Sequence, residues 1–182
     1  VGLVEAVKVA LIRDAAFFEF IAARVQPLSV FAPEPFEAVI RESARQHMEH
    51  IATSGDPFER GSARPLDFGH WAAHKLEQMS AFALSHGEAV AVGMALDLLY
   101  AKASGLLVPA LAQRILTVLQ QLGLALWTPF LDLRGPDGRR TVLEGLEEFR
   151  EHLGGRLSIP MIRAPGDRLE VHEMDLGRVD AA

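Results

Sequence analysis

Residues 67–74 read Asp-Phe-Gly-His-Trp-Ala-Ala-His, and residues 85–94 read Ser-His-Gly-Glu-Ala-Val-Ala-Val-Gly-Met. Each stretch begins a predicted helix, the first over residues 68–83 and the second over residues 85–103. Ser85 and Glu88 have the spacing of a capping box, in which two side chains satisfy free backbone N–H groups at a helix start. We therefore expect two consecutive helices, joined by a tight turn, with histidines near both starts.

The rest of the chain is also predicted to be mostly helical. Apolar residues recur at helical spacing over residues 2–25, and Pro27 is expected to end that helix. Further helices are expected over residues 36–53, 109–122 and 141–153, with an irregular segment at 58–66 and a loop at 128–140. The expected buried positions of the 36–53 helix are Val39, Ile40, Met48 and Ile51. Short strands near 156–163 and 168–172 complete the prediction, which is a single, mostly α domain over residues 1–182 with a small β element near its end.

Composition excludes several classes of function. The chain has 182 residues, a formal net charge of −6, 49% apolar residues and no cysteine. Nucleic-acid binding normally uses a basic face, so an acidic chain argues against it. Without cysteine there is no thiol nucleophile, and any metal must rest on Glu and His. We expect no signal peptide, no membrane span and a cytoplasmic location. Because the chain starts abruptly at Val1 and enters a helical pattern at once, we expect it to be a piece of a longer protein.

Three of the seven histidines form the candidate chemical site. His70 and His74 lie four apart on one predicted helix, so they project from one face. His86 lies in the first turn of the next helix. If the connection folds back, two imidazoles and the carboxylate of Glu5 could form a three-ligand divalent site with open positions, as catalytic metals have. A chance histidine pair on a helix surface and a solvated glutamate explain the same spacing.

Three motifs together are more specific than any one of them. They are Gly-Leu-Val-Glu-Ala-Val-Lys at residues 2–8, the stretch at 67–74, and His-Gly-Glu-Ala-Val-Ala-Val-Gly-Met at 86–94. Their order, and the sixteen-residue step from His70 to His86, resemble the dehydroquinate synthase family of sugar phosphate cyclases. The resemblance covers that family's helical C-terminal domain. It implies an N-terminal Rossmann-like NAD domain that this chain lacks, because no strand, Gly-rich turn and helix unit occurs in it.

The resemblance implies a role for each matching residue. Glu5, His70 and His86 would be metal ligands, for Zn²⁺ or alternatively Co²⁺. Lys8 would be an active-site lysine that binds substrate, and His74 would assist proton transfer beside the substrate phosphate. The implied enzyme is a carbon–oxygen lyase acting on phosphates, in which NAD⁺ oxidises a ring alcohol, phosphate leaves, and an intramolecular aldol step closes a carbocycle. The chain alone is expected to be inactive, and a homodimer is expected.

Two positions before the first histidine depart from the dehydroquinate synthase pattern. Asp67 stands where those synthases carry Asn, and Ala63 stands where they carry Arg, with Arg64 one place later. Losing a cation beside a buried substrate carboxylate costs several kcal/mol by order of magnitude. We therefore favour a heptulose phosphate without that carboxylate, as the valiolone-type cyclases use, over a heptulosonate phosphate.

Two further segments lack cations that the resemblance leads us to expect. His47 and His50 occupy the area of a substrate-binding family lysine, although both are otherwise expected to be surface residues. A late Asp-Lys-Lys segment is replaced by Phe-Arg-Glu at residues 149–151, with His152 at the helix end, where the helix dipole favours it. The expected substrate-binding residues are Lys8, Arg64, Asp67, His74, Arg150 and His152.

Three other functions are weighed against the cyclase. An iron-dependent alcohol dehydrogenase shares the architecture but typically uses Asp, not Glu, as the carboxylate ligand. A metal phosphohydrolase of the His-Asp type is disfavoured because no His-Asp doublet occurs in the sequence. A helical interaction domain that keeps the fold without catalysis agrees with the missing NAD domain and the changed substrate residues. It does not explain why all three ligand positions and His74 are retained.

Overall fold

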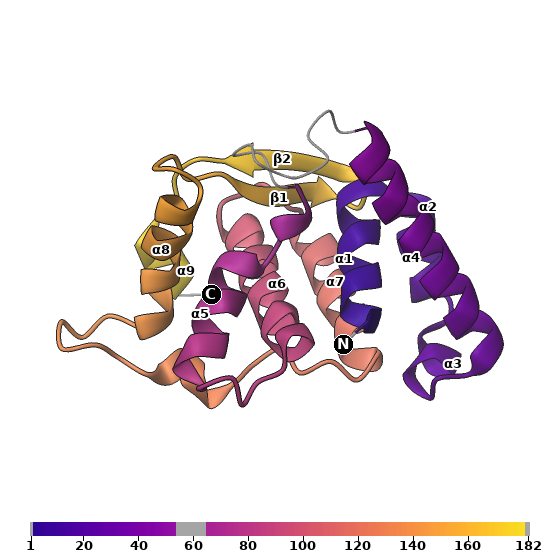
Figure 1. Cartoon of the computed structure of the whole chain (residues 1–182), viewed down its shortest axis with the longest axis horizontal. Coiled ribbons are helices and arrows are strands. Elements are labelled where there is room, and N and C mark those ends of the chain that lie inside the picture. Colours follow the sequence, from indigo (N-terminus) through magenta and orange to yellow (C-terminus); the bar gives the residue numbers. More distant parts are fainter. Residues whose placement is uncertain (1, 54–64, 181–182) are drawn as a thin grey trace.

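The computed structural model describes residues 2–53 and 65–180, which form a helical domain with a hairpin across one edge (Figure 1). In chain order the helices are α1 (Gly2–Arg13), α2 (Ala15–Ala22), α3 (Val25–Ser29), α4 (Pro33–Thr53), α5 (His70–Met79), α6 (His86–Ala103), α7 (Pro109–Gln121), α8 (Glu144–His152) and α9 (Leu176–Asp180). Three short 3₁₀ turns are η1 (Pro65–Asp67), η2 (Pro129–Asp132) and η3 (Thr141–Leu143). Strands β1 (Ile159–Ala164) and β2 (Asp167–Val171) pair antiparallel. The predicted class, mostly α with a small β element near the end, is confirmed.

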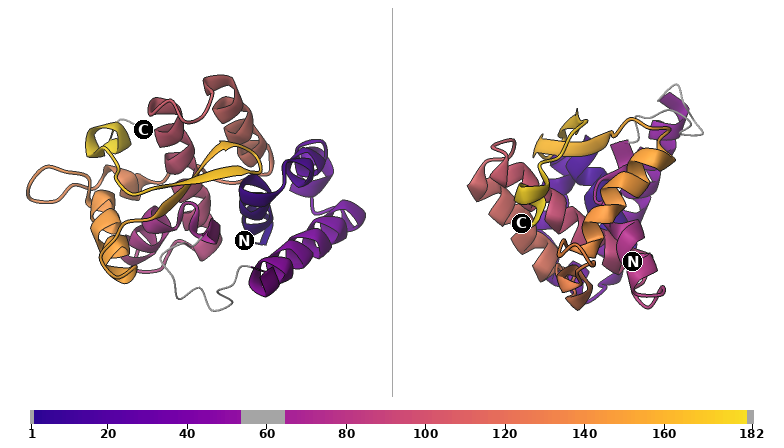
Figure 2. Two further views of the ribbon diagram at one scale, coloured as in Figure 1. Left: turned by 90° about the horizontal axis from the view of Figure 1, so that it is seen from above. Right: turned by 90° about the vertical axis from the view of Figure 1, so that its left-hand side faces the viewer.

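The central element of the fold is α6, whose residues 89–98 are all buried. Helices α1, α5 and α7 and strand β1 all pack on it (Figures 1 and 2). A helix that is apolar on every side belongs in a core, because burying its side chains supplies the main free energy of folding. The position of α6 therefore fixes the positions of the elements around it, including both helix starts that carry histidines.

The start of α5 is pressed against the backbone of α6 through two glycines. A Cβ atom added at Gly93 would lie 2.0 Å from the carbonyl oxygen of Gly69, and one added at Gly69 would lie 2.6 Å from the amide nitrogen of Met94. Gly69 also has a φ of +80°, which favours glycine. No side chain fits between the two backbones, so the first residue of α5, His70, is held at a fixed place on α6.

The single helix predicted over residues 2–25 is wrong. The helix is interrupted at Asp14, between α1 and α2. Oδ1 of Asp14 accepts a hydrogen bond from the backbone N–H of Phe17 at 3.0 Å and so caps α2. Pro27 does not end a helix either, since it lies inside α3. It sits in the first turn of that helix, where a missing N–H group costs nothing.

The buried face predicted for residues 36–53 is also wrong, apart from Val39. Ile40, Met48 and Ile51 are 55%, 69% and 41% exposed, whereas Val39 is 1% exposed. The reason is that α4 packs mainly on α1 and lies at an outer edge of the domain (Figure 2). One face of α4 is therefore enough to hold it, and the other face stays open among the described residues.

The remaining boundaries mostly agree with the sequence. The predictions for residues 85–103 and 109–122 are confirmed by α6 and α7, and the hairpin lies where two strands were expected. The helix predicted over 68–83 ends at Met79, because residues 80–84 turn back toward α6. The short helix α9 was not predicted. Of the segment expected to be irregular, residues 58–64 lie outside the described residues. None of the described helices is long and apolar enough to span a membrane.

Candidate metal centre

Three side chains from three helices converge at one point. Glu5 comes from α1, His70 from the first residue of α5 and His86 from the first residue of α6, and one ligand atom of each lies within 4.8 Å of the other two. The ring centroids of His70 and His86 are 5.4 Å apart. The connection between α5 and α6 therefore does fold back, which is the condition that the sequence left open.

His70 is held in one orientation, and its Nε2 lies 3.5 Å from Nζ of Lys8. Its Nδ1 lies 3.2 Å from the carbonyl oxygen of Phe68, which can only accept, so Nδ1 carries the proton and Nε2 keeps its lone pair. Burial first, and then the nearby charge of Lys8, lower the pKa of His70 to about 3. The imidazole is thus neutral at physiological pH, as a metal ligand must be.

A fully buried carboxylate, Asp97 of α6, supports the turn that carries His70. It accepts hydrogen bonds from the backbone N–H of Gly69 and from Nε1 of Trp71, both at 2.7 Å. Burial raises the pKa of Asp97 to about 7, although both hydrogen bonds favour its charged form. The sequence reasoning missed this residue, and the signal that could have found it is an aspartate that interrupts an apolar run.

Glu5 has one oxygen engaged and one free. Its Oε2 lies 2.7 Å from Nζ of Lys8, a side chain that is 5% exposed. Its Oε1 is buried without a hydrogen-bond partner among the described residues. An unpaired buried carboxylate oxygen next to two imidazoles is a costly arrangement that a cation would relieve. One carboxylate and two histidines also form a donor set that suits Zn²⁺ with positions left for substrate. The residues therefore fit a divalent metal.

The opposite side of the cluster is open to solvent. His74 and His86 are both exposed, and their rings stack with centroids 6.3 Å apart. Nδ1 of His86 lies 3.2 Å from Oε1 of Glu77, a residue that the sequence reasoning also missed. Burial lowers the pKa of His74, and the negative charge of Glu77 opposes that shift. The lowered pKa favours the neutral form of the His74 imidazole at physiological pH.

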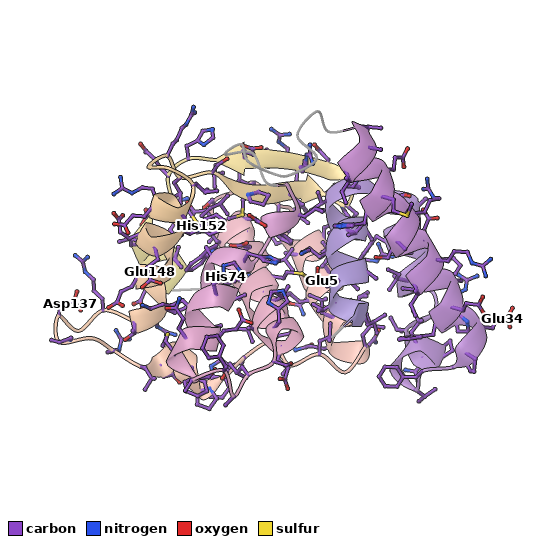
Figure 3. The ribbon with its side chains drawn as sticks, viewed as in Figure 1. Glu5, Glu34, His74, Asp137, Glu148 and His152 are labelled. Carbon is purple, nitrogen blue, oxygen red and sulfur yellow. The ribbon has the colours of Figure 1, made fainter. Side chains whose placement is uncertain are left out.

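Of the other predicted substrate-binding residues, the structure brings one close to His74. The charge of His152, at the end of α8, contributes to lowering the pKa of His74, and Figure 3 shows the two residues on α8 and α5. Asp67 is half-buried at the end of η1. Arg150 is exposed and pairs with Glu147 on its own helix. Arg64 lies outside the described residues.

A groove between α1 and α4 adjoins the cluster. It has a volume of about 510 Å³ and is lined by Leu3, Glu5, Phe36 and His47, among others. His47 is exposed, as expected, but it faces the same groove as Glu5. Nothing is described of the side chain of His50. Glu5 can therefore be reached both from this groove and from the open side of the histidines.

Comparison with known proteins identifies the family. The family model described as "3-dehydroquinate synthase C-terminal" matches residues 2–137. The chain belongs to this family. The match includes every residue of the cluster, and it confirms the family that the three motifs imply.

Two curated relatives of this 3-dehydroquinate synthase C-terminal family member show the extent of the match. A 3-dehydroquinate synthase from Halorhodospira halophila is 32% identical over 94% of the chain and 47% of its own length. A 2-epi-valiolone synthase from Stigmatella aurantiaca is 34% identical over 100% of the chain and 45% of its own length. The chain thus spans about half the length of these relatives.

A solved structure has the same arrangement of elements. The 2-epi-5-epi-valiolone synthase from Streptomyces hygroscopicus subsp. jinggangensis, solved with NAD⁺ and Zn²⁺ bound, superposes with a TM-score of 0.87 at 29% identity. The superposition covers 99% of this chain and 48% of that one. The helical fold that the motifs imply is therefore confirmed over nearly the whole chain.

Proposed function

We propose that this chain is the metal- and substrate-binding half of a sugar phosphate cyclase, a lyase that eliminates phosphate and then closes a carbocycle. The observation that carries the proposal is the convergence of Glu5, His70 and His86, with one buried carboxylate oxygen left unpaired. The relatives named above support the reaction class. Because the chain spans about half of their length, we further propose that an NAD-binding half completes the enzyme and that the chain alone is inactive.

The three ligands, Lys8 and His74 have separate tasks in this proposal. Zn²⁺ or Co²⁺ held by Glu5, His70 and His86 would supply a Lewis acid for the substrate hydroxyls. Lys8 is buried beside Glu5 and His70, so its ammonium can hold a substrate oxygen in a place that water barely reaches. His74 is neutral and exposed, so it can accept or donate a proton beside the leaving phosphate.

We propose a heptulose phosphate such as sedoheptulose 7-phosphate as the substrate, which makes the enzyme a valiolone-type cyclase. Asp67 supports this choice, because its acidic side chain comes shortly before Gly69 and His70 in the sequence. A negative charge at this position disfavours a substrate that carries a carboxylate. Arg64, Asp67, Arg150 and His152 are proposed to bind the substrate, as the resemblance implies. The alternative is a heptulosonate phosphate, which would be the substrate if the enzyme were a dehydroquinate synthase.

Two other functions fit the site less well. A non-catalytic interaction domain does not explain why Glu5 keeps an unpaired oxygen beside two oriented histidines. An iron-dependent alcohol dehydrogenase would be expected to carry Asp in place of Glu5. The resemblance also implies a homodimer, which we propose for the protein and which sedimentation would test.

The deciding experiment follows phosphate release. The protein is joined to an NAD-binding domain, so that the whole has the length of the relatives. It is then incubated with NAD⁺, Zn²⁺ and either sedoheptulose 7-phosphate or the heptulosonate phosphate. We expect release from the first substrate and loss of release with His74→Ala. Release from the second alone would overturn the substrate proposal, and release from neither would overturn the cyclase proposal.

A further inference from the structure

The side chain of Glu77 contacts the most exposed residue of the metal cluster. Its Oε1 lies 3.2 Å from Nδ1 of His86, while the Glu77 side chain is 17% exposed and that of His86 is 43% exposed. A carboxylate can only accept a hydrogen bond, so the proton of the imidazole belongs on Nδ1. Nε2 is then the nitrogen with a lone pair, and it is the one left for a metal.

The local backbone holds Glu77 in the position from which it can reach His86. The carbonyl oxygen of Glu77 accepts hydrogen bonds from the backbone N–H of Phe82 at 2.7 Å and from Oγ of Ser80 at 3.0 Å. Ala81 and Phe82 have φ values of 49° and 61°, in the left-handed region that residues other than glycine rarely adopt. The turn from α5 to α6 is thus tied to the same residue whose carboxylate meets the first residue of α6.

His86 needs such a partner more than His70 does. His70 is buried and donates to a backbone carbonyl within its own turn. Within the described part of the chain, the imidazole of His86 donates a hydrogen bond to Glu77 alone. An exposed imidazole without a partner can rotate and exchange tautomers, which lowers the fraction of molecules that present Nε2 to a metal. Ligating histidines generally donate their second N–H to a carboxylate or carbonyl for this reason.

We propose that Glu77 is a positioning residue, which fixes the ring of His86 with Nε2 turned toward Glu5 and His70. This inference rests on the proposed metal site and deepens it. Glu77 does not contact the metal or the substrate in this proposal. It acts through His86, and its carboxylate makes the imidazole a stronger donor to a divalent cation.

The first test uses the metal-free chain and reads the tautomer of His86 by long-range ¹H–¹⁵N NMR. We expect the proton on Nδ1 in the unmodified chain and a mixture of tautomers in Glu77→Ala. Glu77→Gln keeps an acceptor oxygen and should preserve the Nδ1 tautomer. The same tautomer fraction in all three proteins would overturn the proposal, whether or not a metal binds.

The second test is a titration with Co²⁺, followed by visible absorption. We expect affinity to fall about 10- to 100-fold in Glu77→Ala, with a changed spectrum, and less in Glu77→Gln. The matched control is Glu144→Gln, which removes a glutamate that pairs with Lys75 and leaves Glu148 in place, so affinity should not change. No Co²⁺ binding by the unmodified chain would overturn the metal site. Equal affinity and spectrum in all Glu77 variants would overturn only the role of Glu77.

Discussion

The two histidines of the cluster are held by different means. On the buried side, His70 is fixed by the carbonyl of Phe68, by the backbone contact between Gly69 and Gly93, and by Asp97 beneath the turn. On the open side, His86 is exposed and is oriented by one side chain, Glu77. The difference implies that the contacts around His70 are part of the folded core, so substitutions on this buried half of the site should lower the stability of the protein. The open half is set by side-chain chemistry, so changes there should affect binding and leave the fold intact.

The largest effect is expected where the buried half is tightest. In Gly93→Ala, the new Cβ would lie 2.0 Å from the carbonyl oxygen of Gly69, and backbone atoms cannot move aside as a flexible side chain can. We expect a loss of more than about 3 kcal/mol in the free energy of unfolding, measured by urea denaturation. Gly2→Ala is the matched control, because a Cβ there meets nothing within 4 Å. A loss below about 1 kcal/mol in Gly93→Ala would contradict the role of this contact.

The next effect concerns pH and the buried carboxylate. Because the pKa of Asp97 is raised from 3.8 to about 7 on folding, the folded chain holds a proton that the unfolded chain releases. Stability from this group is therefore fully present below about pH 4 and is lost as the pH rises through about 7, by on the order of 4 kcal/mol.

Asp97→Asn removes that slope and adds a cost of its own. An amide can accept on one oxygen only, so either the Gly69 N–H or the Trp71 Nε1–H loses its acceptor, at about 1–2 kcal/mol. The variant should be less stable than the unmodified chain near pH 4. The order should reverse before pH 7, because the roughly 4 kcal/mol that the unmodified chain loses exceeds the cost of about 1–2 kcal/mol in the variant. Urea denaturation across that range measures both. Asp137→Asn, at an exposed loop tip (Figure 3), should leave the slope unchanged. Parallel pH curves for the unmodified chain and Asp97→Asn would contradict the raised pKa.

A direct comparison of the two halves replaces each histidine in turn. His70→Ala and His86→Ala should both abolish tight Zn²⁺ binding, measured as metal content after dialysis. Only His70→Ala should also lower the free energy of unfolding of the metal-free chain, by about 1–2 kcal/mol, because it empties a buried position. His86→Ala should change it by less than about 0.5 kcal/mol. Unchanged metal content in either variant would remove that histidine from the ligand set.

The smallest effect is expected from the lysine of the buried half. Burial is the main reason for the low pKa of His70, and the charge of Lys8 comes second. In Lys8→Met the pKa of His70 should therefore rise from about 3 yet stay below the ordinary value of 6.5. NMR titration of the His70 ring measures this shift. A return of the pKa to the ordinary value would show that the charge of Lys8, and not burial, keeps the His70 imidazole neutral.

Local features were readable from the sequence because they depend on neighbours along the chain. The capping box at Ser85 and Glu88 predicted where α6 begins, and the hairpin was expected from two short strands separated by Ala-Pro-Gly at residues 164–166. Predictions failed where packing decides. Ile40 and Met48 have helical spacing, but α4 buries only the face that meets α1. The break at Asp14 was missed because its cap replaces one helix with two of similar pattern.

The sequence alone determined the kind of chemistry this protein can offer. Without cysteine, its metal donors are carboxylates and imidazoles, and the motifs already single out Glu5, His70 and His86. Only the tertiary structure decided that these residues meet, because the contact depends on two glycines that let the backbones of α5 and α6 touch. It also decided which residues support the cluster. Asp97 and Glu77 are ordinary acidic residues in the sequence, and their partners are chosen by packing between helices, which no local pattern encodes.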